Sequence, residues 1–254
     1  MPQPNGFTFY GDLLGIGAAY KLSADVAYEK LNKFYNVVFE HLKRLCVNES
    51  LRVNLFSDSL LVWGRDPLAI IGPLQNVYLE LFREKIFLRG AMVDGKVERE
   101  PRIEVKNLQK FLPINDSLAR AVGLEESTKG ARFLISPKLG ERLLANVPEW
   151  RTVEGYIDHA NNGLALESVL RRICPLPEGT AYELLYFWHS SQLSENGFDY
   201  KNGKATLKEI SQYLRPAQVV HYRETVDLIK RSELRDRSTR RAFRTMAASA
   251  SQGR

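Results

Sequence analysis

The sequence has few of the residues that build disulfide frameworks, thiolate metal clusters or membrane spans. Its 254 residues include two cysteines, Cys46 and Cys174, too few for a disulfide scaffold or a thiolate zinc site. No apolar run approaches the ~18 residues that cross a bilayer. The N-terminus lacks a basic segment followed by an apolar one, so we expect no signal peptide. These absences favour a cytoplasmic protein with buried thiols and no membrane contact.

Positive charge is concentrated at the C-terminus. Residues 222–254 hold nine basic and four acidic side chains, which accounts for five of the six net positive charges of the chain. A cationic segment of this kind binds nucleic acid or another anionic surface in some proteins. It is also typical of a solvated helix end, and no aromatic ladder is interleaved with the charges. We favour the solvated helix, and a nucleic-acid-binding protein stays as an alternative.

Hydrophobic periodicity predicts an α+β chain. Strands are expected at residues 7–10, at 51–63 as two strands around a turn at Ser57–Asp58, at 87–93 and at 132–135. Helices are expected at 23–46, 67–84 and 117–126, with another from Pro137. Asp94–Gly95 is expected to be a hairpin turn with a return strand as far as Pro101. His41 falls on the apolar face of its helix and is expected in the core.

Beyond Trp150 the pattern indicates helices at 165–174, 180–193 and 205–235. The predicted organisation is therefore a mixed domain over residues 1–160, followed by a helical extension with a basic tail over 161–254.

Two aspartates stand near the ends of apolar strands, next to small residues. If the fold brings Asp12 and Asp58 together, their oxygens make a site for Mg²⁺ or Mn²⁺. The LLGIG segment after Asp12 offers backbone N–H groups to a phosphate, and a helix that begins there adds its dipole. The alternative is that each aspartate only closes a turn.

Four segments occur in an informative order: FYGDLLGIG, NLFSDSLLVW, FLRGAMVDGKV and SLARAVGLEESTKGARFLIS. The first two resemble the two metal motifs of class III nucleotidyl cyclases, and the others resemble that family's strand-and-turn and helix-plus-strand segments. Together they lie within residues 7–140. The resemblance implies a ferredoxin-like βαββαβ core. Within the family, the chain is most similar to the bacterial pyrimidine cyclases of the Pycsar anti-phage system.

The resemblance also implies residue roles. Asp12 and Asp58 would chelate two Mg²⁺ or Mn²⁺ ions, with help from the Leu13 carbonyl. The N–H groups of the outer-phosphate loop would come from Gly15, Ile16 and Gly17. Lys96 lies in the turn of the segment FLRGAMVDGKV. We add it as our own candidate for a contact to the triphosphate.

Two residues on one strand are candidates for recognising the base. Asn54 lies four residues before Asp58, at a position that helps to choose the base in the family. An amide both donates and accepts, which suits a pyrimidine edge. Arg52 is on the same strand face and is a second candidate.

One departure from the family pattern concerns the transition state. The family helix carries an Asn and, four residues later, an Arg, and the matching positions here are Ala119 and Gly123. Arg120 or Arg89 is expected to supply the missing charge, because a guanidinium binds phosphate oxygens bidentately. The departure also leaves open a catalytically inactive pseudocyclase that binds a nucleotide as a sensor.

The expected function is therefore a cyclase that converts a pyrimidine nucleoside triphosphate, UTP ahead of CTP, to the 3′,5′-cyclic monophosphate and pyrophosphate. By resemblance the product is a second messenger in anti-phage defence. Family sites lie between two subunits, so a two-fold homodimer is implied.

Overall fold

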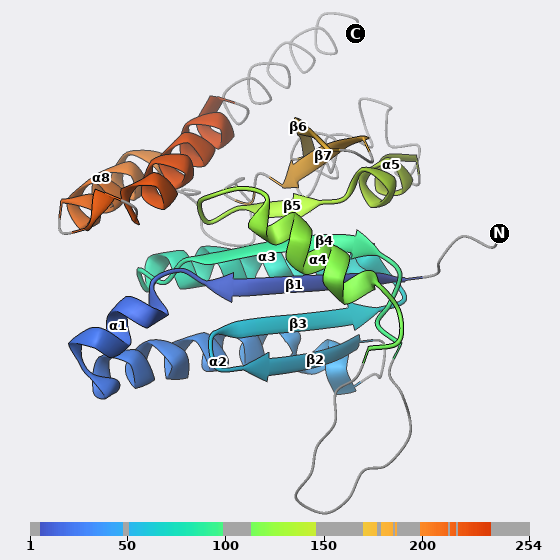
Figure 1. Cartoon of the computed structure of the whole chain (residues 1–254), viewed down its shortest axis with the longest axis horizontal. Coiled ribbons are helices and arrows are strands. Elements are labelled where there is room, and N and C mark those ends of the chain that lie inside the picture. The colour runs from blue at the N-terminus through green and yellow to red at the C-terminus, as the bar shows by residue number, and fades with distance from the viewer. Residues whose placement is uncertain are drawn as a thin grey trace, which may run out of the picture. The chain divides into compact units, whose positions relative to one another are not determined.

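The computed structural model describes residues 6–47, 51–98, 113–145, 170–176, 179–184, 186, 199–212, 214–216 and 218–234 (Figure 1). The chain divides into two units. The first comprises Met1–Thr128 with Leu134–Leu139, and the second comprises Lys129–Phe133 with Gly140–Arg254. In the described part of the chain, no helix has the length and apolar character that a bilayer span requires.

The first unit is built on a βαββαβ core. Its elements are β1 (Phe7–Leu13), α1 (Ile16–Leu22), α2 (Ala24–Val47), β2 (Leu51–Phe56), β3 (Ser59–Gly64), α3 (Pro67–Arg83), β4 (Leu88–Asp94) and α4 (Ser117–Glu126). The strands lie in the order β2-β3-β1-β4, and each neighbouring pair is antiparallel. This is the strand order of a ferredoxin-like sheet, so the expected α+β class and core are confirmed.

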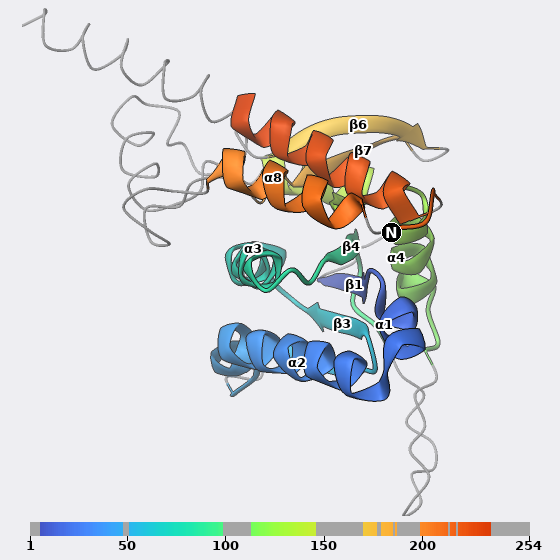
Figure 2. The ribbon, with the colours of Figure 1, turned by 90° about the vertical axis from the view of Figure 1, so that its left-hand side faces the viewer.

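The two faces of this sheet are covered by different helices. α2 and α3 lie on one face and α4 on the other (Figure 2). Because successive strand residues alternate between faces, Phe9 points toward α3, where its ring and the Tyr78 hydroxyl leave no room for a Cβ at Gly90. Tyr10 and Asp12 consequently face α4. The alternation of β1 therefore separates a packed apolar face from a polar one.

Side-chain capping hydrogen bonds mark the start of each of the two long helices. The Ser23 hydroxyl accepts from the Val26 N–H at 3.1 Å and begins α2, as the sequence predicts. Asp66 accepts from the N–H groups of Leu68 and Ala69 at the start of α3. His41 of α2 is only partly buried, and it contacts the Glu80 carboxylate of α3 at 2.7 Å. It therefore links the two helices from the edge of the core.

The second unit differs from the expected helical extension. β6 (Leu170–Leu176) and β7 (Gly179–Leu184) form an antiparallel hairpin. The helices expected at 165–174 and 180–193 are therefore wrong wherever the structure describes those residues. The helix expected at 205–235 is found as α8 (Tyr200–Ser211) and a second helical stretch at 218–234.

The smaller elements complete the comparison with the sequence. β5 (Phe133–Ile135) and α5 (Pro137–Ala145) are found where the sequence predicts a strand and a helix. The return strand expected after Gly95 is not seen over residues 96–98, and the rest of it lies outside the described residues.

Candidate functional site

The end of β1 lies against the turn between β2 and β3. Asp12 is the Cα partner of Ser59 in the β1–β3 ladder, and the Leu13 N–H donates to the Asp58 carbonyl at 3.0 Å. Ser57, in the same turn, has a left-handed φ of 50°. Asp12 and Asp58 are both partly exposed. The structure therefore brings together the two aspartates that the sequence places 46 residues apart.

The Asp12 carboxylate is oriented by hydroxyl groups. The Ser59 hydroxyl donates to Asp12 Oδ1 at 3.1 Å, and the Tyr10 hydroxyl shares a hydrogen bond of 3.1 Å with Ser59 Oγ. Burial, and after it the negative charge of Asp58, raises the pKa of Asp12. A nearby divalent cation would remove this repulsion.

Arg89 lies beside Asp12, held by a carboxylate of α4. Arg89 is the Cα partner of Asp12 in the β1–β4 ladder. Its Nε donates to Oε1 of Glu125, and its Nη1 reaches the Thr128 carbonyl at 3.5 Å. The Glu125 side chain is 2% exposed, and burial raises its pKa against the opposing hydrogen bond and charge of Arg89. The guanidinium is therefore fixed next to the aspartate pair.

Glu125 is a site residue that the sequence reasoning missed. It shares the buried face of α4 with Ser117, Ala121 and Leu124. An acidic side chain on the apolar face of a helix rarely stays unpaired, because burying a lone charge is costly. The place of Glu125 on the apolar face of this helix is therefore the sequence feature that could have predicted a buried cationic partner.

The loop after Asp12 places Gly15 and Gly17 beside open space. Gly15 has φ 87° and precedes α1, whose Ala18 and Ala19 N–H groups donate to the Gly15 carbonyl. The N–H groups of Ile16 and Gly17, in the first turn, have no acceptor within the helix. A Cβ built at Gly15 or Gly17 meets no atom within 4 Å. The Ile16 side chain is buried and anchors the turn.

The two candidate base-recognition residues lie on the strand that leads to Asp58. Arg52 is exposed and Asn54 is half-buried. They share one face of β2, while Val53 and Leu55 occupy the other.

Arg120 and Lys96 lie at the opposite end of the sheet. Arg120 donates to Asp94 through Nη1 to Oδ1 at 2.9 Å and through Nη2 to the carbonyl at 2.8 Å. Asp94 is the Cα partner of Phe7, five residues along β1 from Asp12. Five strand residues span about 17 Å. Within one chain, therefore, Arg120 and Lys96 do not join the aspartate pair.

Asp94 is a buried ion-pair partner at that far end. It is 3% exposed, and Lys138 contacts it at 3.2 Å in addition to Arg120. Burial alone would raise the pKa of Asp94, but the hydrogen bonds and charges of Arg120 and Lys138 outweigh it and hold the pKa below its usual value. The Asp94 side chain therefore does not lie at a solvated hairpin tip.

The two positions that depart from the cyclase pattern are exposed. Ala119 and Gly123 lie one turn apart on the solvent-facing side of α4. A Cβ at Gly123 meets no atom within 4 Å. Neither position therefore supplies the side chain that the family pattern has there.

The donor set at Asp12 and Asp58 fits a magnesium or manganese ion. Among the described residues, no group of three or more His, Cys, Asp or Glu side chains could hold a metal. Mg²⁺, however, is commonly bound by one or two carboxylates and completed by water and substrate phosphates. Asp12, Asp58 and the Leu13 carbonyl would supply ligands of that chemistry, next to the loop that the resemblance assigns to phosphate.

The chain is similar to solved cyclase structures, but only distantly. No protein-family model and no curated protein sequence matches it. A bacterial light-regulated adenylyl cyclase is 10% identical with a TM-score of 0.49, over 82% of this chain and 99% of that one. The adenylyl cyclase CyaB from P. aeruginosa is 14% identical with a TM-score of 0.47, over 72% and 94%.

The guanylate cyclase domain of RhGC from Catenaria anguillulae, solved with GTP, is 14% identical with a TM-score of 0.46, over 72% of this chain and 98% of that one. These are likenesses of fold alone.

Proposed function

We propose that this protein is a nucleotidyl cyclase whose substrate is a pyrimidine nucleoside triphosphate, UTP ahead of CTP. The observation that carries the proposal is the convergence of Asp12 and Asp58 beside the open backbone of Gly15–Gly17. Paired carboxylates next to unpaired N–H groups suit a metal-bound polyphosphate. The four sequence segments that resemble the class III cyclases support the same reading.

Each part of the site has a task in closing the ring between the ribose 3′-oxygen and the α-phosphorus. Mg²⁺ or Mn²⁺ held by Asp12, Asp58 and the Leu13 carbonyl would lower the pKa of the 3′-hydroxyl and neutralise charge that develops at phosphorus. The Ser59 hydroxyl keeps the Asp12 carboxylate in one orientation. The N–H groups of Gly15, Ile16 and Gly17 bind the outer phosphates, which leave as pyrophosphate.

Arg89 is oriented by Glu125 and adds positive charge beside the aspartates. This charge favours both the ionised form of Asp12 and the negatively charged substrate.

We assign recognition of the base to the face of β2 that carries Arg52 and Asn54. Asn54 offers a donor and an acceptor to the edge of a pyrimidine, and Arg52 offers donors only. The cyclic product would act as a second messenger in anti-phage defence, as the similarity to the pyrimidine cyclases implies.

The proposal includes a homodimer. Arg120 and Lys96 are about 17 Å from the aspartate pair along β1, so they serve that pair only if a second copy presents them. A two-fold arrangement places the Arg120 end of each chain at the Asp12 end of the other. The site then contains the guanidinium that Ala119 and Gly123 lack.

The direct test is to incubate the protein with each of the four ribonucleoside triphosphates and Mn²⁺, and to identify products by mass spectrometry. We expect cyclic UMP in the largest amount, with cyclic CMP next. Asp12→Asn should reduce the rate at least about 100-fold, while Asp25→Asn, at an exposed position of α2, should not change it. Product formation that survives Asp12→Asn would contradict the assigned site.

The alternative is a catalytically inactive nucleotide-binding protein. The exposed Ala119 and Gly123 favour it, since they leave no transition-state pair on α4. Saturable binding of a triphosphate with Mn²⁺, dependent on Asp12 and Asp58 but without any cyclic product, would establish the sensor in place of the enzyme.

A further inference from the structure

The loop between α4 and β5 passes from the first unit to the second and back. The chain belongs to the first unit as far as Thr128, Lys129–Phe133 belong to the second unit, and Leu134 returns to the first. The loop is therefore a route along the chain by which the second unit can act on the first.

The start of this loop holds Arg89. Glu125, in the last turn of α4, accepts from Arg89 Nε, and the Thr128 carbonyl accepts from Arg89 Nη1 at 3.5 Å. The Arg89 side chain is 13% exposed. The position of this guanidinium beside Asp12 consequently depends on where the end of α4 and the first loop residues lie.

Side chains of the second unit bind the middle of the loop. The Ala131 N–H donates to the Thr225 hydroxyl at 2.9 Å, and the Ala131 carbonyl accepts from the Tyr186 hydroxyl at 2.5 Å. The Gly130 N–H donates to Nδ1 of His221 at 3.3 Å. Thr225 and Tyr186 are buried. Removing one of these hydroxyl groups leaves a buried backbone group without its partner, which is costly.

The helical stretch at 218–234 packs closely on the loop at Gly130. This glycine has φ 93°, and a Cβ built on it would lie 2.8 Å from the Glu224 Cβ and 3.2 Å from the His221 carbonyl oxygen. The Thr225 hydroxyl donates to the same His221 carbonyl at 2.7 Å, which leaves its oxygen lone pairs to the loop. The loop backbone therefore lies directly on the helical turn that carries His221 and Thr225.

A buried carboxylate anchors the end of the loop. Glu183 of β7 is fully buried, and its Oε1 contacts Nε of Arg132 at 2.5 Å and Nη2 of Arg231 at 3.1 Å. Arg132 is a loop residue, and Arg231 belongs to the helical stretch at 218–234. Breaking a buried ion pair of this kind is strongly destabilising. The second unit thus determines the conformation of the loop from Gly130 to Arg132.

We propose that Thr225 is a positioning residue for the cyclase reaction, and that the helical stretch at 218–234 holds Arg89 in place through this loop. The inference rests on the proposed function, in which the charge of Arg89 attracts the triphosphate. It gives the second unit, which lies outside the βαββαβ core, a task at the candidate site.

The shortness of the loop makes the coupling effective. Gly130 comes two residues after Thr128, and two residues span at most about 7 Å. A displaced Gly130 therefore moves the Thr128 carbonyl and the end of α4 that carries Glu125. A misplacement of about 1 Å at a group that positions substrate can lower a rate by as much as about 100-fold.

The first experiment measures steady-state cyclisation of UTP with Mn²⁺. Thr225→Val keeps the shape of the side chain and removes the hydroxyl, so we expect KM to rise and kcat/KM to fall about tenfold. Thr225→Ser retains the hydroxyl and should keep kcat/KM within about twofold of the native value. Tyr186→Phe removes the hydrogen bond to the Ala131 carbonyl and should act in the same direction. Native kinetics in folded Thr225→Val or Tyr186→Phe proteins would overturn the proposal.

A double-mutant cycle shows whether Thr225 acts through Arg89. Substitutions that act through one shared group have non-additive effects. Thr225→Val should therefore change kcat/KM by less than about twofold in an Arg89→Gln background. An equal loss in both backgrounds would show that Thr225 acts independently of Arg89 and would overturn the proposal.

A readout without nucleotide separates this inference from the proposed function. The Arg89 Nε proton, which is donated to Glu125, exchanges slowly with solvent while that contact is held. ¹⁵N NMR of the full chain follows the exchange, and the signal is assigned by its absence from Arg89→Gln. We expect exchange at least about tenfold faster in Thr225→Val. Faster exchange in a chain that forms no cyclic product would contradict the proposed function alone, whereas unchanged exchange would overturn the inference.

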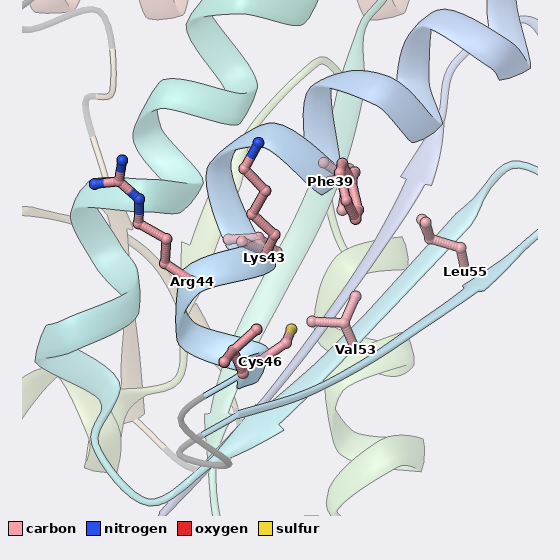
Figure 3. Close-up of a pocket in the computed structure, with 9 residues that line it drawn as sticks. Phe39, Lys43, Arg44, Cys46, Val53 and Leu55 are labelled. Atoms are coloured by element: carbon pink, nitrogen blue, oxygen red, sulfur yellow. The ribbon is translucent and has the colours of Figure 1, made fainter.

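Two control variants remove contacts that do not involve the loop. Ser232→Ala lies in the same helical stretch, where the native hydroxyl donates to a carbonyl of its own helix at 2.9 Å. Phe39→Ala lies at a groove of about 750 Å³ between α2 and β2 (Figure 3). Both should leave kcat/KM and the Arg89 exchange rate within about twofold of native values. A loss in Ser232→Ala as large as that in Thr225→Val would show a general weakening of the helix and overturn the role of Thr225.

Discussion

Ser59 donates to one oxygen of Asp12, and the charge of Asp58 acts on the same carboxylate. Two negative groups held close together cost stability in the absence of a cation, and a cation bound between them would remove that cost. The same arrangement makes its residues testable without an activity assay.

The first prediction concerns Asp58→Asn. Removing its charge should raise the unfolding free energy of the metal-free protein by about 0.5 kcal/mol, because the repulsion at a partly exposed pair is modest. Mn²⁺ should raise the melting temperature of the native protein but not of the variant. Thermal unfolding with and without Mn²⁺ measures both, and Asp25→Asn is the matched control. A variant that Mn²⁺ stabilises as much as the native chain would exclude Asp58 as a ligand.

Asp94 supports a second prediction, on pH. Its pKa is lower in the folded state than in the unfolded state, so its stabilising contribution is present above the unfolded pKa and is lost as pH falls through the folded value. Asp94→Asn should therefore reduce the unfolding free energy at pH 7 by about 2 kcal/mol, with a smaller difference below roughly pH 3. Urea titrations at the two pH values test this. A difference that is independent of pH would assign the loss to packing instead.

At the scale of elements, α4 is a helix with two distinct faces. Its buried face carries Glu125 toward Arg89, and its exposed face carries Ala119 and Gly123. A glycine inside a helix is less favourable than alanine, because it gains more backbone freedom on unfolding.

The third prediction is that Gly123→Ala stabilises the protein by about 0.5–1 kcal/mol. A Cβ there meets no atom within 4 Å, so no strain opposes the gain. Urea unfolding of the variant, beside Ala119→Gly as the converse change, measures the effect. Destabilisation by Gly123→Ala would show that this face is packed in solution.

The elements also show where sequence reasoning succeeds. The pattern predicts a helix at 117–126, and α4 has those bounds. The turn at Ser57–Asp58 separates β2 from β3 as predicted. In both places local propensity, turn residues and hydrophobic period agree, which is the condition under which sequence specifies structure.

The β6–β7 hairpin shows why the same reasoning fails elsewhere. Its segments contain Leu, Ala, Glu and Arg, which favour helices, and short apolar runs do not distinguish strand from helix. The two segments pair with each other from Leu170–Leu184 to Leu176–Gly179, and strand propensity depends on such context.

At the scale of the molecule, the βαββαβ order explains which part of the candidate site could be foreseen. β1 and β3 are antiparallel neighbours, so the end of β1 must meet the turn before β3, and Asp12 meets Asp58. The position of Arg120 depends on which end of the sheet the start of α4 occupies. No periodicity in the sequence encodes that choice, and the structure places Arg120 beside Asp94.

The separation of Asp12 from Arg120 has a genetic consequence. If each catalytic centre takes its aspartates from one polypeptide and its guanidinium from the other, two chains with different inactivating substitutions can complement one another in a dimer. We expect Asp58→Asn and Arg120→Gln to be inactive as homodimers. A purified heterodimer with one copy of each, selected through two affinity tags, should regain about half of the native rate, because one of its two centres is intact. A heterodimer as inactive as its parents would mean that each chain works alone.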